Sequence, residues 1–124
     1  MPGYVDGFVI PIPKKNVAFY QRVAKKACAV WMEYGALDYK ECIADDVSAK
    51  GHLSFPQLSK AKPSETVVFA WIVFKSRAHR DKVNAQVMKD PRLAKMMAGG
   101  AMPFDTKRMT YGGFKTIVET KTKS

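Results

Sequence analysis

Asp6 is the residue whose position most clearly invites a chemical role. It interrupts an apolar segment, Tyr4 to Ile12, which predicts a buried strand, and a buried carboxylate is costly without a partner. Arg108 or Tyr111, on a segment expected beside this strand, could be that partner. Two interpretations stay open: Asp6 is a polar anchor or acid/base group in an apolar cavity, or it is a strand-end carboxylate satisfied by water or backbone amides.

His79 offers a second kind of chemistry, the binding of an anion. It lies in the first turn of a predicted helix beside Arg77 and Arg80, where free backbone N–H groups and basic side chains can receive a negative group. Nearly every helix offers such an N-terminus, so a helix cap with solvated charges is the simpler interpretation.

Aromatic side chains are numerous enough to line a pocket for a small molecule. They are Tyr4, Phe8, Phe69, Trp71, Tyr111 and Phe114. Aromatic residues also dominate cores and interfaces, and that role accounts for them as well. Our hypothesis is a ligand-binding cavity between the sheet and the helices. Its candidate residues are Asp6, Trp71, Arg108, Tyr111 and His79, and no catalytic residue is assigned.

Other chemistries lack the residues that they need. The two histidines and the two cysteines stand far from each other in the sequence, and no HxxxH or carboxylate–histidine grouping exists, so we expect no metal site. No nucleophile elbow, dinucleotide fingerprint or P-loop is present, so we expect no cofactor.

The elements that must position these residues follow from hydrophobic periodicity. Strands are predicted at Tyr4 to Ile12, Leu37 to Ala44, Thr66 to Phe74 and Arg108 to Glu119. Helices are predicted from the cap Asn16 to Tyr34, with Gly35 as the stop, and from the cap Ser76 to about Met88, followed by a short helical turn after Pro91.

Two segments between these elements have special features. Residues 45–64 predict a long irregular connection, parts of which Leu53, Phe55 and Leu58 could hold to the core. The Gly112–Gly113 pair in the last strand predicts a bulge or a close backbone approach.

This order predicts an α+β protein with a ferredoxin-like βαββαβ plan. Right-handed crossovers place both helices on one face of a four-stranded antiparallel sheet, whose inner strands are the first and third. These are also the two most apolar strands, so pattern and topology agree. Residues 1–120 form the single expected domain, and 121–124 form a short C-terminal tail.

The third strand, Val67 to Phe74, is apolar at both odd and even positions. The helices can cover only one face of the sheet, so the other face exposes an apolar surface unless something covers it. Self-association through this face is the economical answer, and we expect an isologous homodimer.

Four stretches carry a resemblance to a known family: Tyr4 to Pro11, Val68 to Phe74, Ser76 to Asn84 and Lys107 to Phe114. Together they resemble the YbaA-like family of small, uncharacterised bacterial proteins, and the similarity runs from about Tyr4 to Val118. The resemblance implies a dimeric α+β barrel, in which two sheets pack face to face with the helices outside. It brings no activity and no catalytic residue.

The formal charge of +10 favours a second function class. Most of the excess lies on the two predicted helices, where it is either a solvated outer face or a surface for an acidic partner such as RNA. No RNA-binding motif is visible and the aromatic residues are not interleaved with the basic ones, so nucleic acid is not the expected partner.

The remaining features concern location. The N-terminus lacks the pattern of a signal peptide, no apolar run is long enough to span a bilayer, and two cysteines make no disulfide framework, so we expect a cytoplasmic protein without membrane contact. The function stays unknown. The best hypothesis is a small-molecule-binding protein or a cofactor-independent enzyme, and the alternative is a non-catalytic interaction module with basic helices.

Overall fold

The structure is a computed structural model that describes residues 3–48, 50–98 and 103–120. The predicted tail, residues 121–124, lies outside the described residues. Among the helices that are described, none is both long and apolar enough to cross a membrane.

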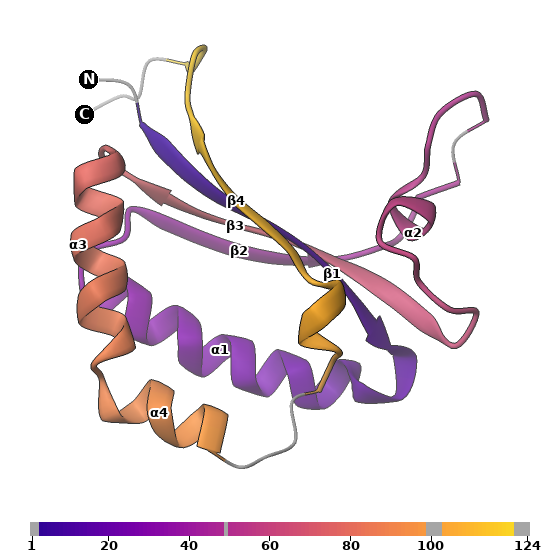
Figure 1. Ribbon diagram of the computed structural model, residues 1–124, viewed down its shortest axis with the longest axis horizontal. Helices are drawn as coiled ribbons and strands as arrows, with labels where there is room; N and C mark the ends of the chain where they lie inside the picture. Colours follow the sequence, from indigo (N-terminus) through magenta and orange to yellow (C-terminus); the bar gives the residue numbers. More distant parts are fainter. Residues whose placement is uncertain (1–2, 49, 99–102, 121–124) are drawn as a thin grey trace.

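A four-stranded antiparallel sheet forms one layer of the molecule, in the order β2-β3-β1-β4 (Figure 1). The inner strands are β1 (Tyr4–Pro13) and β3 (Glu65–Phe74), which pair along their whole length. The outer strands are β2 (Asp38–Ile43) and β4 (Thr110–Lys115). This order confirms the prediction that the two most apolar strands lie inside the sheet. An inner strand has a neighbouring strand at both edges, so apolar side chains suit it.

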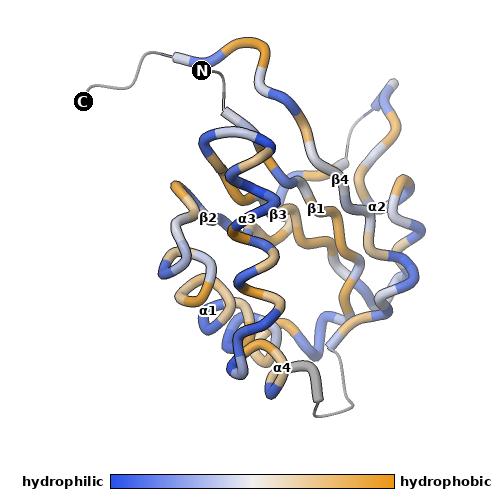
Figure 2. Tube along the Cα trace, turned by 60° about the vertical axis from the view of Figure 1, so that its left-hand side comes forward, coloured by the Kyte–Doolittle hydropathy of each residue, from blue (hydrophilic) through white to orange (hydrophobic). Residues whose placement is uncertain are grey.

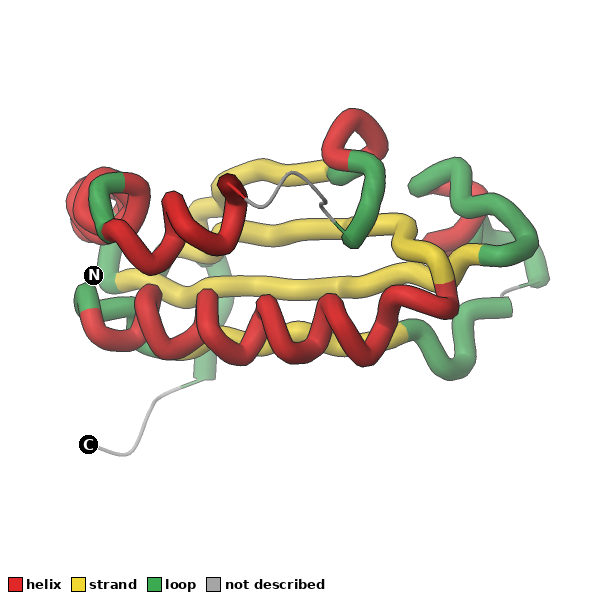
Figure 3. The backbone as a smooth tube through the Cα atoms, turned by 90° about the horizontal axis from the view of Figure 1, so that it is seen from below, coloured by secondary structure: helices red, strands yellow, loops and turns green. Residues whose placement is uncertain are grey.

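Helices α1 (Val17–Glu33), α3 (Arg77–Met88) and α4 (Pro91–Ala98) form the second layer, on one face of the sheet (Figures 1 and 3). Ser76 caps α3 as predicted, since its hydroxyl accepts from the N–H of His79 at 3.1 Å. Asn16 occupies the N-cap position of α1, as predicted, but its side chain makes no capping hydrogen bond. A 3₁₀ turn, Lys14–Asn16, leads into that helix, and the Asn16 side chain donates instead to the carbonyl of Pro103 at 2.9 Å.

The connection between β2 and β3 contains a short helix, α2 (Phe55–Leu58), that the sequence analysis missed. Its signal was the capping box of Ser54 and Gln57, in which each residue satisfies the backbone N–H of the other. Phe55 packs edge-on against Phe69, with ring centroids 5.7 Å apart. All three residues predicted to hold this segment to the core, Leu53, Phe55 and Leu58, are exposed, so that prediction is wrong, and the contact of Phe55 is with Phe69 outside the two core clusters.

The last strand is shorter than predicted. A 3₁₀ turn, Thr106–Arg108, capped by Asp105, precedes β4, and therefore Arg108 lies outside the strand. The pairing of β4 with β1 continues without a bulge through Gly112 and Gly113. The close approach is confirmed, because a Cβ atom on Gly113 would overlap the side chain of Tyr4.

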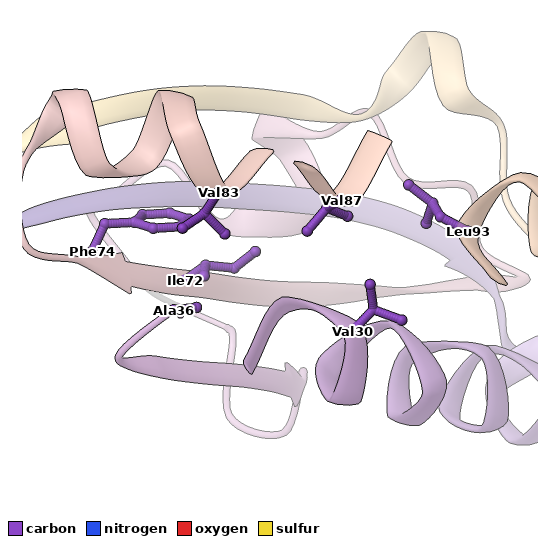
Figure 4. Packing of buried hydrophobic residues seen from close by; sticks show 7 residues of the cluster. All are labelled: Val30, Ala36, Ile72, Phe74, Val83, Val87 and Leu93. Carbon is purple, nitrogen blue, oxygen red and sulfur yellow. The ribbon is translucent and has the colours of Figure 1, made fainter. Parts of the chain in front are cut away.

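The core lies between the sheet and the helices as two clusters. Figure 4 shows the larger one, which contains Val30, Ala36, Ile72, Phe74, Val83, Val87 and Leu93. The smaller one contains Ile10, Ile12, Val68 and Ala70. Even-numbered positions of β1 and β3 supply both clusters, as expected for strands that alternate faces.

The odd-numbered positions of the inner strands, together with the residues of β4 that pair with those of β1, form a separate surface on the other side of the sheet. We call this surface the open face. It consists of Val5, Gly7, Val9, Phe69, Trp71, Val73, Thr110, Gly112 and Phe114. Phe69 is 43% exposed and Phe114 is 62% exposed. The apolar pattern of β3 thus leaves a large apolar surface that α1, α3 and α4 do not cover, as predicted, while Phe55 of α2 packs against Phe69 on it.

Candidate functional site

Asp6 is buried on the helix side of the sheet, with only 1% of its surface exposed. Its carboxylate accepts from Arg80 Nη1 at 2.9 Å, from Asn84 Nδ2 at 3.2 Å and from Tyr111 Oη at 3.2 Å. We call these four residues the Asp6 network. Of the two predicted partners of Asp6, Tyr111 is confirmed, whereas the prediction of Arg108 is wrong because Arg108 pairs with Glu65.

The elements of the fold explain why Arg80 is the partner. Arg80 and Asn84 are one turn apart on α3, so both project from the same side of this helix toward β1. The guanidinium of Arg80 also lies over the ring of Tyr4, 5.0 Å from its centroid, and donates to Tyr111 Oη at 2.8 Å. Its side chain is only 14% exposed, so this arginine does not belong to a solvated basic face as the sequence analysis assumed.

The Asp6 carboxylate is well supplied with hydrogen bonds, because three of its about four acceptor positions are used. Three donors from α3 and β4 occupy the carboxylate, and burial together with the charge of Asp6 raises the pKa of the Tyr111 hydroxyl. Tyr111 therefore stays protonated and serves as a donor. These contacts favour the interpretation of Asp6 as a polar anchor that holds α3 on the sheet.

A cavity of about 190 Å³ lies beside this network, between the sheet, α1 and α4. It is lined by Phe8, Ile10, Tyr20, Val23, Ala24, Ala27, Trp31, Tyr39, Lys40, Glu41, Ala70, Ile72, Leu93, Met96, Phe104 and Met109. Ile72 and Leu93 belong to the larger core cluster, and Ile10 and Ala70 belong to the smaller one. The cavity therefore separates the two clusters.

Small side chains create this cavity. Ala24 and Ala27 on α1 and Ala70 on β3 all line it, at positions where most core residues of this chain are larger. Two other lining residues link it to the Asp6 network: Trp31 Nε1 donates to Asn84 Oδ1 at 2.9 Å, and Phe8 stacks on Tyr111 with centroids 4.9 Å apart. The network thus fixes part of the cavity wall.

Glu41 is the acidic group of the cavity. Its Oε2 accepts from Tyr39 Oη at 2.6 Å, and its Oε1 accepts a short hydrogen bond from Tyr20 Oη. Burial, and then the charge of Glu41, raise the pKa of both tyrosines above the usual value of 10.0, so both remain neutral phenols. We call Tyr20, Tyr39 and Glu41 the carboxylate clamp.

The carboxylate clamp was not predicted from the sequence, although each of its members carried a signal there. Tyr39 and Glu41 share one face of β2 because they are two positions apart. Tyr20, like Val17, lies on the face of α1 that packs on this side of the sheet. A tyrosine on a buried helix face needs a hydrogen-bond partner for its hydroxyl, and Glu41 on the covered face of β2 can supply it.

Trp71 lies on the open face, and the prediction that it joins Asp6 is wrong. It pairs with Gly7, whereas Asp6 pairs with Ile72, and neighbouring positions of a strand point to opposite faces. Trp71 packs against Phe69 with centroids 5.5 Å apart. The aromatic set of the sequence analysis is therefore divided between the two faces of the sheet.

His79 is engaged in local contacts. Its Nδ1 accepts from the backbone N–H of Lys75 at 3.0 Å, and its ring meets Phe74 edge-on. Burial, followed by the charges of Lys75 and Lys82, lowers the pKa of the imidazole. A neutral, hydrogen-bonded histidine favours the helix-cap interpretation over the binding of an anion.

Arg108 lies far from Asp6 along β1, because it precedes β4. Its two terminal nitrogens donate to the two oxygens of Glu65, each at 2.7 Å. These hydrogen bonds hold the pKa of Glu65 at about 2, below the usual 4.5. The pair closes the end of the β1–β3 ladder, where Glu65 faces Pro13.

This ion pair predicts a pH dependence of stability. A carboxyl whose pKa is lower in the folded state stabilises the fold above pH 4.5, and this contribution is lost as the pH falls toward 2. We expect the free energy of unfolding, measured by urea titration, to lose about 2 kcal/mol from this pair over that range. In Arg108→Gln this part of the acid sensitivity should disappear, and an equally steep fall would contradict the assignment.

Comparisons with known proteins bear on the family and on the fold. Residues 3–106 match the model of a family described as "Protein of unknown function (DUF1428)". The chain is 43% identical over 116 residues to the uncharacterized protein YbaA of Escherichia coli strain K12. The aligned segment covers 94% of this chain and 97% of that protein. YbaA of Shigella flexneri matches with the same values.

Solved structures with low sequence identity share the architecture. A dimeric ferredoxin-like protein from an uncultured marine organism superposes with a TM-score of 0.62 at 12% identity, covering 97% of this chain and all (100%) of that one. A nipsnap family protein with unknown function from Agrobacterium tumefaciens gives 0.59 at 13% identity, covering 93% and 88%. At such identities the likeness concerns the fold, and the predicted ferredoxin-like plan is confirmed.

Proposed function

The chain belongs to the DUF1428 family, of unknown function, and from this premise we propose that it binds a small, mainly apolar molecule in the cavity between its sheet and its helices. The observation that carries the proposal is an apolar cavity of about 190 Å³ with one carboxylate in its wall. Small-molecule sites combine these two features, an apolar lining and a few placed polar groups.

The size of the cavity sets the size of the molecule. Apolar cavities of roughly 150 Å³ are able to hold a benzene molecule. At this ratio the cavity of about 190 Å³ fits a ligand of about eight non-hydrogen atoms, or the apolar part of a larger one. The cavity wall includes Met96 and Met109, whose flexible side chains adapt to the shape of a ligand.

A cavity-filling variant tests this proposal. Benzyl alcohol is a suitable probe, since its ring suits the volume and its hydroxyl can donate to Glu41. In Ala27→Leu the added side chain occupies the cavity, and we expect the affinity measured by NMR titration to fall at least about tenfold, while stability rises by about 1 kcal/mol.

The matched control is Ala18→Leu, at an exposed position of the same helix, which should bind as the unmodified chain does. The proposal fails if the unmodified chain shows no saturable binding, or if Ala27→Leu binds the probe equally well. Affinity that is retained in Ala27→Leu would place the probe elsewhere on the molecule.

We also propose that a second copy of the chain covers the open face. The support is the apolar character of this face, on which Phe69 and Phe114 remain largely exposed. Monomers seldom leave a continuous apolar surface of this kind uncovered. The likeness to a dimeric ferredoxin-like protein agrees with this arrangement.

An acidic macromolecular partner has less support. Figure 2 shows hydrophilic stretches on α1 and α3, but two of the arginines on the helices are held in ion pairs, one of them buried and one at the surface. Arg80 pairs with Asp6, and Arg92 pairs with Asp90 and Glu33 at 2.9 and 2.7 Å. Because these charges are already compensated, the helices present less free positive charge than the sequence suggests.

A further inference from the structure

We infer that the ligand of the cavity is an apolar amine, bound as its ammonium ion with Glu41 as the counter-ion. This inference rests on the proposed function and adds the chemical class of the ligand. It follows from the charge of the carboxylate clamp, from its unused hydrogen-bonding capacity and from the aromatic residues around it.

The negative charge of Glu41 has no cation beside it in the described part of the chain. Both of its hydrogen-bond partners are phenols, and burial keeps these neutral. Lys40 also lines the cavity, but as the strand neighbour of Glu41 it points to the opposite face of β2, where it pairs with Asp38 at 3.1 Å. None of the ion pairs among the described residues includes Glu41. A half-buried carboxylate without a cation favours a positively charged ligand.

Glu41 also retains acceptor sites. A carboxylate offers about four acceptor positions, and the clamp uses one on each oxygen. An ammonium group brings three donors and no acceptor, so it matches the positions that remain. A ligand carboxylate would instead meet the like charge of Glu41 inside an apolar cavity, and we expect it to be excluded.

Aromatic residues surround the same space. Five of the lining side chains are aromatic: Phe8, Tyr20, Trp31, Tyr39 and Phe104. Aromatic rings attract cations through the negative charge on their faces, most strongly where water is excluded. The lining thus favours a cation close to Glu41 and an apolar body further inside.

Three probes with the same shape but different charge test the inference on the unmodified chain. They are benzylamine, benzyl alcohol and benzoate, titrated near neutral pH and followed by NMR. We expect benzylamine to bind about tenfold more tightly than benzyl alcohol, because a charge-assisted hydrogen bond is about twice as strong as a neutral one. Benzoate should show no saturable binding.

The variant Glu41→Gln keeps the size of the side chain and removes its charge. We expect the affinity for benzylamine to fall at least about tenfold and the affinity for benzyl alcohol to fall by a smaller factor. The amine assignment is overturned if benzyl alcohol binds the unmodified chain as tightly as benzylamine does. It is also overturned if Glu41→Gln leaves the affinity for benzylamine within about twofold.

The probes separate this inference from the proposed function. Binding of benzyl alcohol without a preference for benzylamine removes the amine alone, and the cavity remains a ligand site. If none of the three probes binds, the proposed function fails and the inference fails with it. The comparison on the unmodified chain needs no variant, so a folding defect in Glu41→Gln cannot hide the answer.

Discussion

Replacing Arg80 with methionine is expected to lower the free energy of unfolding by about 3 kcal/mol. The substitution keeps a long apolar side chain at this position but removes the cation that lies 2.9 Å from Asp6. Asp6 is 1% exposed, so water cannot replace the lost charge, and only Asn84 and Tyr111 remain as donors. Urea unfolding of the purified variant measures the effect.

Two further variants make this result interpretable. In the double variant Asp6→Asn with Arg80→Met no buried charge remains, and most of the lost stability should return. Arg77→Met removes an exposed arginine from the same helix turn and should change stability by less than about 0.5 kcal/mol. A loss below about 1 kcal/mol in Arg80→Met would show that Asp6 does not depend on this partner.

Replacing Trp71 with glutamate should separate the proposed dimer into monomers. Trp71 lies in the middle of the open face, next to Phe69 and opposite Gly7 on β1. If a second copy covers this face, the glutamate charge is buried without a partner, and we expect the dissociation constant to rise more than about 100-fold. Sedimentation at micromolar concentration would then give a mass near 13.9 kDa for the variant and about twice that mass for the unmodified chain.

Met88→Glu is the matched control, because Met88 is 59% exposed on α3, away from the open face. This variant should sediment like the unmodified chain. A monomeric unmodified chain at micromolar concentration would contradict the proposed dimer directly. An unchanged dimer in Trp71→Glu would place the interface on another surface.

The strand order could be predicted because the two strands with the most apolar residues, β1 and β3, must lie in the middle of the sheet. Val67 to Phe74 is apolar at both parities, which requires a central strand, and the short crossovers then place the helices on one face. The ends of α1 were predicted correctly, but the partner of its cap residue was not. The Asn16 side chain donates to a carbonyl 87 positions away, and no local sequence pattern indicates such a contact.

The partner of Asp6 could not be predicted for a related reason. The neighbouring strand β4 supplies Tyr111, as predicted, but the cation comes from α3, 74 positions further along the chain. Arg80 resembled its exposed basic neighbours in the sequence. Only the docking of α3 on the sheet decides which of them is buried.

The cavity is the feature that is hardest to derive from the sequence. Ala24 and Ala27 of α1 and Ala70 of β3 all line it, so its position depends on how the helix is placed along the strands. Alanine is common in both helices and cores, and none of the three is unusual alone. The carboxylate clamp depends on the same docking, because it joins α1 to the edge strand β2.

A crystal structure of the chain with benzylamine tests the central claim most directly, since it locates the molecule. We predict the aromatic ring of the probe between α1 and the sheet, beside Ala27 and Ala70, with its nitrogen within hydrogen-bonding distance of a Glu41 oxygen. Benzylamine on the open face, or a cavity filled by the side chains of Met96 and Phe104 in the presence of the probe, would contradict the claim.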